Sequence, residues 1–156
     1  MKLIIVHGAS CSGKSTYVRE HMEDADICYD YDRLVQATTN RTKHTEDVAP
    51  SYKLINGLRY SMLKNFKDYK ETKGNLYFIT TYLTTNFEEF ANEEDIEYHY
   101  MDVTREECLE RLKKDDSREN KDFWKDKINE YFDKKEKEEQ KANEQRMKLK
   151  IKLKTF

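Results

Sequence analysis

Proline, glycine and cysteine are scarce in this sequence. Its 156 residues include one proline, four glycines and three cysteines. The cysteines, Cys11, Cys28 and Cys108, are widely spaced and odd in number, so they predict neither a disulfide framework nor a cysteine metal site. The four histidines are equally scattered, and we expect them to be structural or exposed rather than metal ligands. Unpaired cysteines are typical of a reducing compartment, so we expect a cytoplasmic protein.

Long apolar runs and a strong net charge are absent as well. No stretch approaches the ~20 consecutive apolar residues of a membrane helix, and we expect no contact with a membrane. The apolar run at 3–6 is short and meets a glycine-rich loop, which argues against a signal peptide. Because the net charge is -2, the chain is not a polycation, and any contact with nucleic acid must come from a local basic patch.

Length and composition predict one domain. Charged residues make up 38% of the chain and hydrophobic residues 37%, which is enough apolar material for one compact core but not for two. We therefore expect residues 1–156 to form a single domain.

Segments with strand character and segments with helical spacing alternate along the chain. The strand segments are 3–6, 26–29, 76–81 and 96–103. The helical segments are 14–22, one from residue 32, 51–69, a short one around 87–90 that Thr84 or Thr85 would cap, and one that Thr104 would cap. This alternation predicts a three-layer α/β fold with a mostly parallel central sheet and helices on both faces. The loops after the first three strands should then meet at one edge of the sheet.

The most specific signal is the phosphate-loop motif G-x-x-x-x-G-K-[ST] between a strand and a helix. It is matched at every fixed position by Gly8, Ala9, Ser10, Cys11, Ser12, Gly13, Lys14 and Ser15. Glycines let consecutive backbone amides face a phosphate, and the helix N-terminus adds positive charge. Lys14 would bridge the β- and γ-phosphates, Ser15 would bind magnesium, and Thr16 would lie near the α-phosphate or pack. The motif predicts binding of a nucleoside triphosphate, and we expect ATP with Mg²⁺.

Acidic and basic residues follow the second strand. A kinase needs an acceptor hydroxyl in line with the γ-phosphate, and a carboxylate there can orient the hydroxyl and take its proton. We expect Asp30 to be this base and Asp32 to cap the next helix, although the roles could be exchanged. Arg33 would hold an acceptor phosphate through its planar guanidinium.

The order of these motifs resembles the kinase domain of phage polynucleotide kinases. The resemblance includes a loop of the form G-x-x-x-S-G-K-S-T, then Asp-x-x-Arg after the second strand, and a later helix that contains Arg111. It implies that Lys14 and Ser15 contact the triphosphate and metal, that Asp30 is the base, and that Arg33 holds the acceptor phosphate. It also implies that Arg111 is a lid arginine that clamps the transferring phosphate. The location would be the host cytoplasm if the chain is phage-encoded.

The chain departs from that family at the end of the third strand. The family has an aspartate there, whereas this sequence has Thr80, Thr81 and Tyr82. This departure weakens what the resemblance implies about the metal and acceptor geometry, and the missing carboxylate argues against a motor ATPase.

Basic residues after the fourth strand indicate a possible lid, and an irregular segment indicates a possible substrate loop. Arg105, Arg111 and Arg118 flank a charged stretch after the fourth strand, where a cationic lid would exclude water from the phosphates. Arg111 and Arg118 could each bring charge to the γ-phosphate, and a solvated helix face is the alternative. The polar segment 38–50 is either a substrate loop or a plain connector.

The C-terminal part, 133–156, is the least regular. A long polar helix from residue 122 would extend to about residue 148. Apolar residues and lysines then alternate with period two from Met147, which predicts a final sheet strand, an edge that pairs with a second chain, or a frayed tail. An oligomer through this strand is therefore one expectation.

Together these features favour an ATP-dependent kinase of a 5'-hydroxyl on RNA or DNA. The alternatives are a kinase of a nucleoside monophosphate or another small acceptor, since the pair Asp30 and Asp32 also resembles shikimate-type kinases, and a non-catalytic nucleotide-binding regulatory module.

Overall fold

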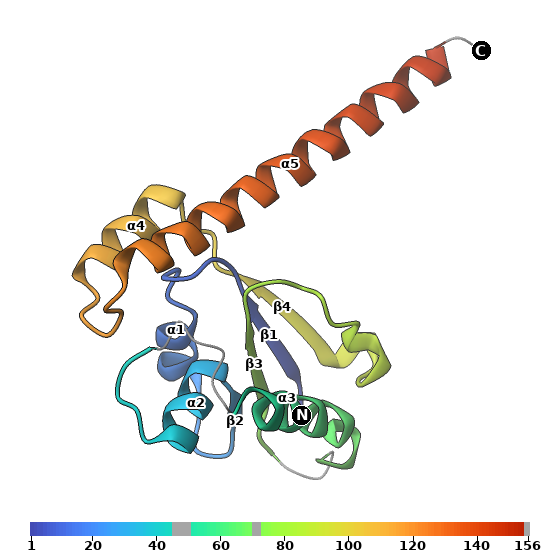
Figure 1. The fold of residues 1–156 in the computed structure, drawn as a ribbon. Helices are drawn as coiled ribbons and strands as arrows, with labels where there is room; N and C mark the ends of the chain where they lie inside the picture. Colours follow the sequence, from blue (N-terminus) through green and yellow to red (C-terminus); the bar gives the residue numbers. More distant parts are fainter. Residues whose placement is uncertain (45–50, 70–72, 155–156) are drawn as a thin grey trace.

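Four parallel strands form the centre of the molecule. The computed structural model describes residues 1–44, 51–69 and 73–154. The strands are β1 (Leu3–His7), β2 (Ile27–Tyr29), β3 (Leu76–Thr80) and β4 (Ile96–Tyr100). Their order in the sheet is β2-β3-β1-β4, and every neighbouring pair is parallel, as the sequence predicts (Figure 1). This order places the loop after β1 at the middle of one sheet edge.

Helices connect the strands. The α-helices are α1 (Lys14–His21), α2 (Tyr31–Thr39), α3 (Tyr52–Lys64), α4 (Arg105–Lys114) and α5 (Lys121–Lys154), and the 3-10 helices are η1 (Phe66–Tyr69), η2 (Phe87–Glu89) and η3 (Glu93–Asp95). Thr104 caps α4 as predicted: its hydroxyl accepts a hydrogen bond from the Glu107 amide, and the Thr104 amide donates to the Glu107 carboxylate.

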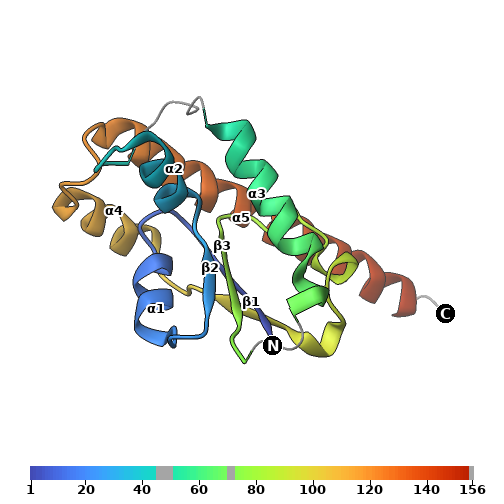
Figure 2. The same ribbon diagram turned by 90° about the horizontal axis from the view of Figure 1, so that it is seen from below.

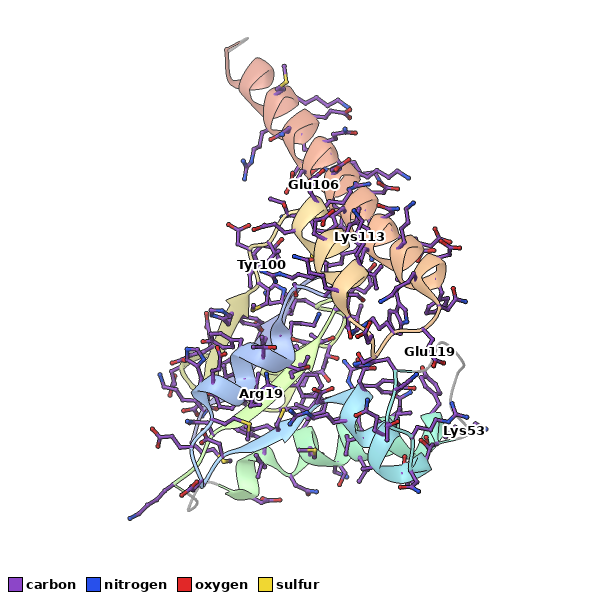
Figure 3. The ribbon with its side chains drawn as sticks, turned by 90° about the vertical axis from the view of Figure 1, so that its left-hand side faces the viewer. Arg19, Lys53, Tyr100, Glu106, Lys113 and Glu119 are labelled. Atoms are coloured by element: carbon purple, nitrogen blue, oxygen red, sulfur yellow. The ribbon has the colours of Figure 1, made fainter. Side chains whose placement is uncertain are left out.

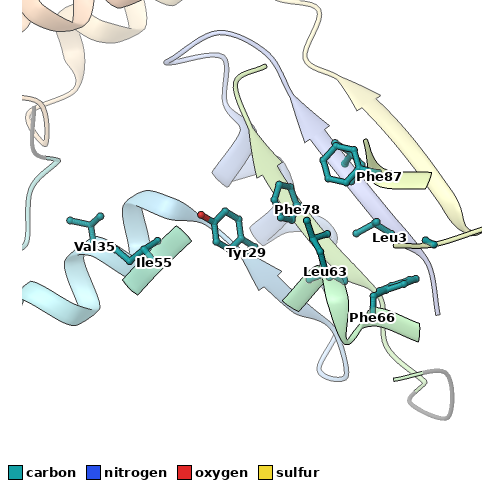
Figure 4. Close-up of a cluster of buried hydrophobic side chains, with 11 residues drawn as sticks. Leu3, Tyr29, Val35, Ile55, Leu63, Phe66, Phe78 and Phe87 are labelled. Carbon is teal, nitrogen blue, oxygen red and sulfur yellow. The ribbon is translucent and has the colours of Figure 1, made fainter. Parts of the chain in front are cut away.

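The core has a separate cluster on each face of the sheet. Leu3 and Ile5 of β1 point to one face, where α2 and α3 cover them, and Figure 4 shows this cluster around Phe78. Val6, one position along, points to the other face and packs with Val18 of α1. Side chains alternate in this way because successive residues of a strand face opposite sides. Figure 2 shows α2 and α3 on the same side of the sheet.

A third cluster joins the phosphate loop to the two C-terminal helices. Ala9 packs with Cys108 and Leu112 of α4 and with Ile128 of α5. This contact fixes α4 and its basic residues over the loop after β1.

The C-terminal strand was predicted wrongly, since α5 continues as a helix to Lys154. A helix already in progress needs no new nucleus, and lysine, leucine and methionine are good helix formers, so the period-two pattern does not end it. From Glu136 to Lys148 every side chain is exposed, and the helix projects away from the body (Figures 1 and 3). The expected oligomer through a C-terminal strand therefore loses its basis.

Several boundaries also differ from the prediction. The helix expected over 51–69 is α3 followed by η1, and the segment around Phe87 is a 3-10 helix with Asn86 rather than Thr84 or Thr85 at its N-cap. β4 ends at Tyr100 rather than at residue 103. Residues 45–50 of the expected substrate loop lie outside the described residues. No helix in the described ranges is both long and apolar enough to cross a membrane.

Candidate functional site

The phosphate loop adopts a conformation that its glycines make possible. Gly8 and Gly13 have φ angles of 146° and 96°, in the region that side chains disfavour. A Cβ on Gly8 would lie 3.1 Å from the Cβ of Met101, so the loop also passes close to the segment after β4. Gly13 is the N-cap of α1, and the first amides of this helix have no side-chain cap. These amides are available to an anion.

Lys14 lies folded against its own loop. Its Nζ donates to the backbone oxygens of Gly8 and Ala9 over 2.8 and 2.6 Å. Burial lowers the pKa of Lys14 to about 8, from an ordinary value of 10.5. Among the described residues no carboxylate is within ion-pair distance of it. A partly buried ammonium without a carboxylate partner is suited to receive an anionic ligand.

Two other residues shape the same loop. The Ser12 hydroxyl is buried, with 1% of the residue exposed, and has no hydrogen-bond partner in the described part of the chain. Burial raises the pKa of the Cys11 thiol, so this side chain is neutral and does not repel a phosphate.

Asp30 stands beside the loop at the end of β2. It is 5% exposed, and its Oδ2 accepts a hydrogen bond from Oγ of Ser15 over 2.8 Å. Its Oδ1 accepts from the amides of Asp32 and Arg33, so Asp30, and not Asp32, is the N-cap of α2. The sequence prediction of the cap was therefore wrong, because one carboxylate both caps the helix and faces the loop.

Asp32 faces the cleft next to a histidine. Nδ1 of His44 lies 3.1 Å from Oδ2 of Asp32. Burial raises the pKa of Asp32, but the nearby His44 and Arg118 lower it by more, so the net pKa lies below the ordinary value. Asp32 is therefore a carboxylate at neutral pH.

The two predicted arginines on either side of the loop lie in different environments. Arg111 of α4 donates from its guanidinium to the backbone oxygens of Ser12, over 2.8 Å, and Cys11, over 3.5 Å. Arg33 is more than half exposed, and its Nε is 3.9 Å from Oδ2 of Asp30. Arg33 is not among the described residues that line the cleft, whereas Arg111 is.

Arg118 and Arg105 also differ. Arg118 forms an ion pair with Asp115, and its guanidinium lies 4.8 Å from the centre of the Trp124 ring. Arg118 and Trp124 both line the cleft. Arg105 instead pairs with Asp133 and Glu136 of α5, so it joins two helices outside the cleft.

A cleft of about 940 Å³ brings these residues together. Lys14, Ser15, Asp30, Arg111 and Arg118 all line it. Sequence reasoning missed further lining residues, among them Arg19, Tyr52, Asn56, Arg59, Lys114 and Trp124. The spacing of Tyr52, Asn56 and Arg59, at i, i+4 and i+7, was the one available signal, since it predicts a common helix face. The cations of the cleft outnumber its carboxylates, which suits a polyanionic ligand.

The residues present fit a magnesium ion held together with phosphates. The Ser15 hydroxyl and the Asp30 carboxylate are hard oxygen donors that lie side by side. No group of three or more metal-binding side chains occurs in the described part of the chain. Mg²⁺ is commonly held by one or two protein oxygens, with water and substrate phosphates completing its shell.

Comparison with known proteins agrees with this architecture. Residues 3–136 match the family model AAA_33, an AAA domain. No curated protein sequence is significantly similar to the chain. A chain in the structure of the Pnkp1/Rnl/Hen1 RNA repair complex is similar in fold, with a TM-score of 0.59 and 21% sequence identity. That similarity covers 87% of this chain and 45% of the other, so this chain spans less than half of its structural neighbour. Because the family model covers most of the sequence, the chain belongs to the AAA domain family AAA_33, with the P-loop and parallel sheet of a nucleotide-binding, kinase-like fold.

Proposed function

We propose that this protein is a kinase that transfers the γ-phosphate of ATP to a 5'-hydroxyl of RNA or DNA. The observation that carries the proposal is the buried Asp30 carboxylate, bonded to Ser15 of the phosphate loop over 2.8 Å. A nucleotide-binding module needs the loop alone. A carboxylate at this place is required when a hydroxyl must be oriented and deprotonated next to a phosphate.

The proposed reaction uses three side chains. Lys14 binds the β- and γ-phosphates and follows the negative charge as it moves. Asp30 accepts the proton of the acceptor hydroxyl while that oxygen forms a bond to the γ-phosphorus. The bond between this phosphorus and the β–γ bridging oxygen breaks, and ADP leaves with the electron pair. Arg111 leaves the backbone oxygens of the loop and binds the transferring phosphate, whose negative charge it stabilises.

Other residues support these three. The amides of residues 8–16 cradle the triphosphate, and Arg118 binds the nucleotide from the lid segment. Ser15 would hold Mg²⁺, which would supply positive charge to the phosphates. Arg33 acts through its ion pair with Asp30, since it does not line the cleft.

Two observations favour a nucleic acid as the acceptor. The solved structure similar in fold comes from an RNA repair complex. The cleft also contains the cations Arg19, Arg59 and Lys114 in addition to those assigned to ATP, so it can bind phosphates of a second ligand. We further propose that residues 1–156 act as one P-loop domain.

The test is transfer of labelled γ-phosphate from ATP with Mg²⁺. The acceptors are a 5'-hydroxyl oligonucleotide, a panel of nucleoside monophosphates, and water alone. Label on the oligonucleotide that disappears with Asp30→Asn supports the proposal. Label only on a monophosphate assigns the protein to small acceptors, and ATP binding without transfer to any acceptor assigns it to the regulatory modules.

A further inference from the structure

One face of α3 forms a wall of the cleft that the phosphate chemistry does not use. Tyr52, Asn56 and Arg59 follow one another at intervals of four and three residues, and all three line the cleft. This spacing places their side chains in one row on the helix. The row lies on the same side of the sheet as α2, which Asp30 caps (Figure 2). The row and the proposed base line the same cleft.

Arg59 brings an unneutralised positive charge to this wall. Its guanidinium donates to the hydroxyl of Thr85 and lies 5.2 Å from the centre of the Phe78 ring. No carboxylate forms an ion pair with it among the residues that the structure describes. A half-buried guanidinium that has only neutral partners is a site for an anionic group, and its planar fork matches a phosphate.

Asn56 presents a free amide one turn earlier. The residue is half-buried, and its side chain makes no hydrogen bond within the described part of the chain. An amide offers one acceptor and one pair of donors side by side, which is the pattern needed to pair with the edge of a nucleobase.

Tyr52 supplies an aromatic surface at the start of the row. Its ring centre is 6.3 Å from that of Tyr31, and the two rings meet at 67°. Tyr52 is 46% exposed, so part of its ring is available for contact. Aromatic side chains of this kind stack on unpaired bases in proteins that bind single-stranded nucleic acid.

We infer that this face of α3 reads the terminal nucleotide of the acceptor and makes the transfer selective for its base. Tyr52 stacks on the base, Asn56 hydrogen-bonds the base edge, and Arg59 binds the phosphate that follows. The inference rests on the proposed function and deepens it, because it assigns a base-selective subsite next to the transfer site. Arg33, the other arginine near Asp30, lies outside the cleft lining and is the natural competitor for the phosphate.

The test measures phosphoryl transfer to four single-stranded oligonucleotides that differ only in the 5'-terminal base. One good bidentate contact to a base corresponds to roughly tenfold discrimination, so the best and worst wild-type acceptors should differ in kcat/KM by about that factor. Asn56→Ala should retain transfer and reduce the difference to about twofold. The matched control is Asn65→Ala, which removes an amide bonded to Ser61 outside the cleft and should leave the ranking unchanged.

Two arginine variants test the phosphate contact. Arg59→Gln should raise KM for every oligonucleotide by roughly tenfold and keep the ranking of the bases. Arg33→Gln should change KM for the oligonucleotide much less. A larger KM effect of Arg33→Gln, equal transfer to all four bases by the wild type, or an undiminished difference between the bases in Asn56→Ala would each overturn the inference.

An equilibrium measurement separates this inference from the proposed function. If no oligonucleotide accepts label, the kinase proposal fails, and affinities of the same four oligonucleotides are measured by titration calorimetry. Base-dependent affinity that Asn56→Ala abolishes still supports the α3 subsite. Affinity that is equal for all four bases, or absent, overturns it.

Discussion

The Ser15 hydroxyl donates to Oδ2 of Asp30, and this 2.8 Å bond connects the first turn of α1 to the first residue before α2. Oδ1 of Asp30 accepts hydrogen bonds from two backbone amides of α2. One buried carboxylate therefore holds a helix in place and faces the phosphate loop. The two functions can be separated by substitution, since asparagine caps a helix nearly as well as aspartate but is not a base.

Asp30→Asn should abolish turnover and leave the fold intact. Loss of a general base typically lowers the rate by 10² to 10⁴, whereas the retained cap should keep the unfolding free energy within about 0.5 kcal/mol of the wild type. Nucleotide affinity should change little, because Lys14 and the loop amides are untouched. Turnover, urea unfolding and nucleotide titration on the same preparation measure the three quantities.

Asp30→Ala is the matched comparison. It removes both the base and the cap, so it should lose as much activity as Asp30→Asn and in addition about 1 kcal/mol of stability. Equal stability of the two variants would show that the cap contributes nothing. Full activity of Asp30→Asn would exclude Asp30 as the base.

Nucleotide binding should weaken as pH rises above about 8. Burial lowers the pKa of Lys14 to about 8, so the free protein loses the Lys14 charge above that pH, while a bound triphosphate favours the charged form. Affinity for ATP should be flat below this pKa and fall by up to tenfold per pH unit above it. Titration calorimetry near pH 8.5 in buffers of different ionisation enthalpy should detect proton uptake. Lys14→Met should bind weakly at every pH and take up no such proton.

Lys14 also makes the unfolding free energy depend on pH when no nucleotide is bound. Lys14 binds its proton more weakly in the folded chain than in the unfolded chain, whose pKa is the ordinary 10.5. Between about pH 8 and 10.5 the unfolded state therefore holds more protons, and Lys14 alone makes the folded state more stable as pH rises through this window. Urea unfolding of the wild type and of Lys14→Met measures this effect. The unfolding free energy of the wild type, relative to that of Lys14→Met, should increase with pH through this window.

Arg111→Gln should reduce turnover far more than nucleotide affinity. In the free protein this arginine bonds to the loop oxygens of Ser12 and Cys11, and we propose that it moves to the transferring phosphate. An arginine in that role contributes about 10³ or more to the rate. The control is Lys113→Gln on the same helix, whose exposed side chain pairs with Glu110 and should leave turnover within about twofold (Figure 3). Similar losses in both variants would assign Arg111 to the general charge of the helix.

The sequence predicts the phosphate loop and the position of Asp30 well, because each depends on local information. The loop geometry comes from contiguous residues, and a parallel sheet places the residues after β1 and β2 at the same edge. The strand order, with β3 between β2 and β1, was not predicted. The α3 face was not predicted, since α3 reaches the cleft only through its packing on Phe78 and Val35. The spacing of Tyr52, Asn56 and Arg59 predicts a common helix face, but it does not show that this face reaches the cleft.

The C-terminal helix shows a different limit of sequence reasoning. A period-two pattern indicates a strand only where one face becomes buried against a core. Met147, where the pattern begins, is 64% exposed, so no buried face at this position favours a strand. Local helix propensity and the helix already formed over residues 121–135 then decide the conformation.

Two glycines outside the site should respond to alanine in opposite directions. A Cβ on Gly74 would lie 1.8 Å from the backbone oxygen of Ala25, so Gly74→Ala should force the segment before β3 apart from the one before β2 and lower stability by roughly 2 kcal/mol or more. A Cβ on Gly57, within α3, would meet nothing within 4 Å. Gly57→Ala should therefore stabilise the protein by about 1 kcal/mol, because alanine restricts the unfolded chain and favours the helix. Urea unfolding of both variants measures the two changes in stability. Destabilisation by Gly57→Ala would mean that the Cβ of residue 57 meets another part of the chain that this structure does not place near it.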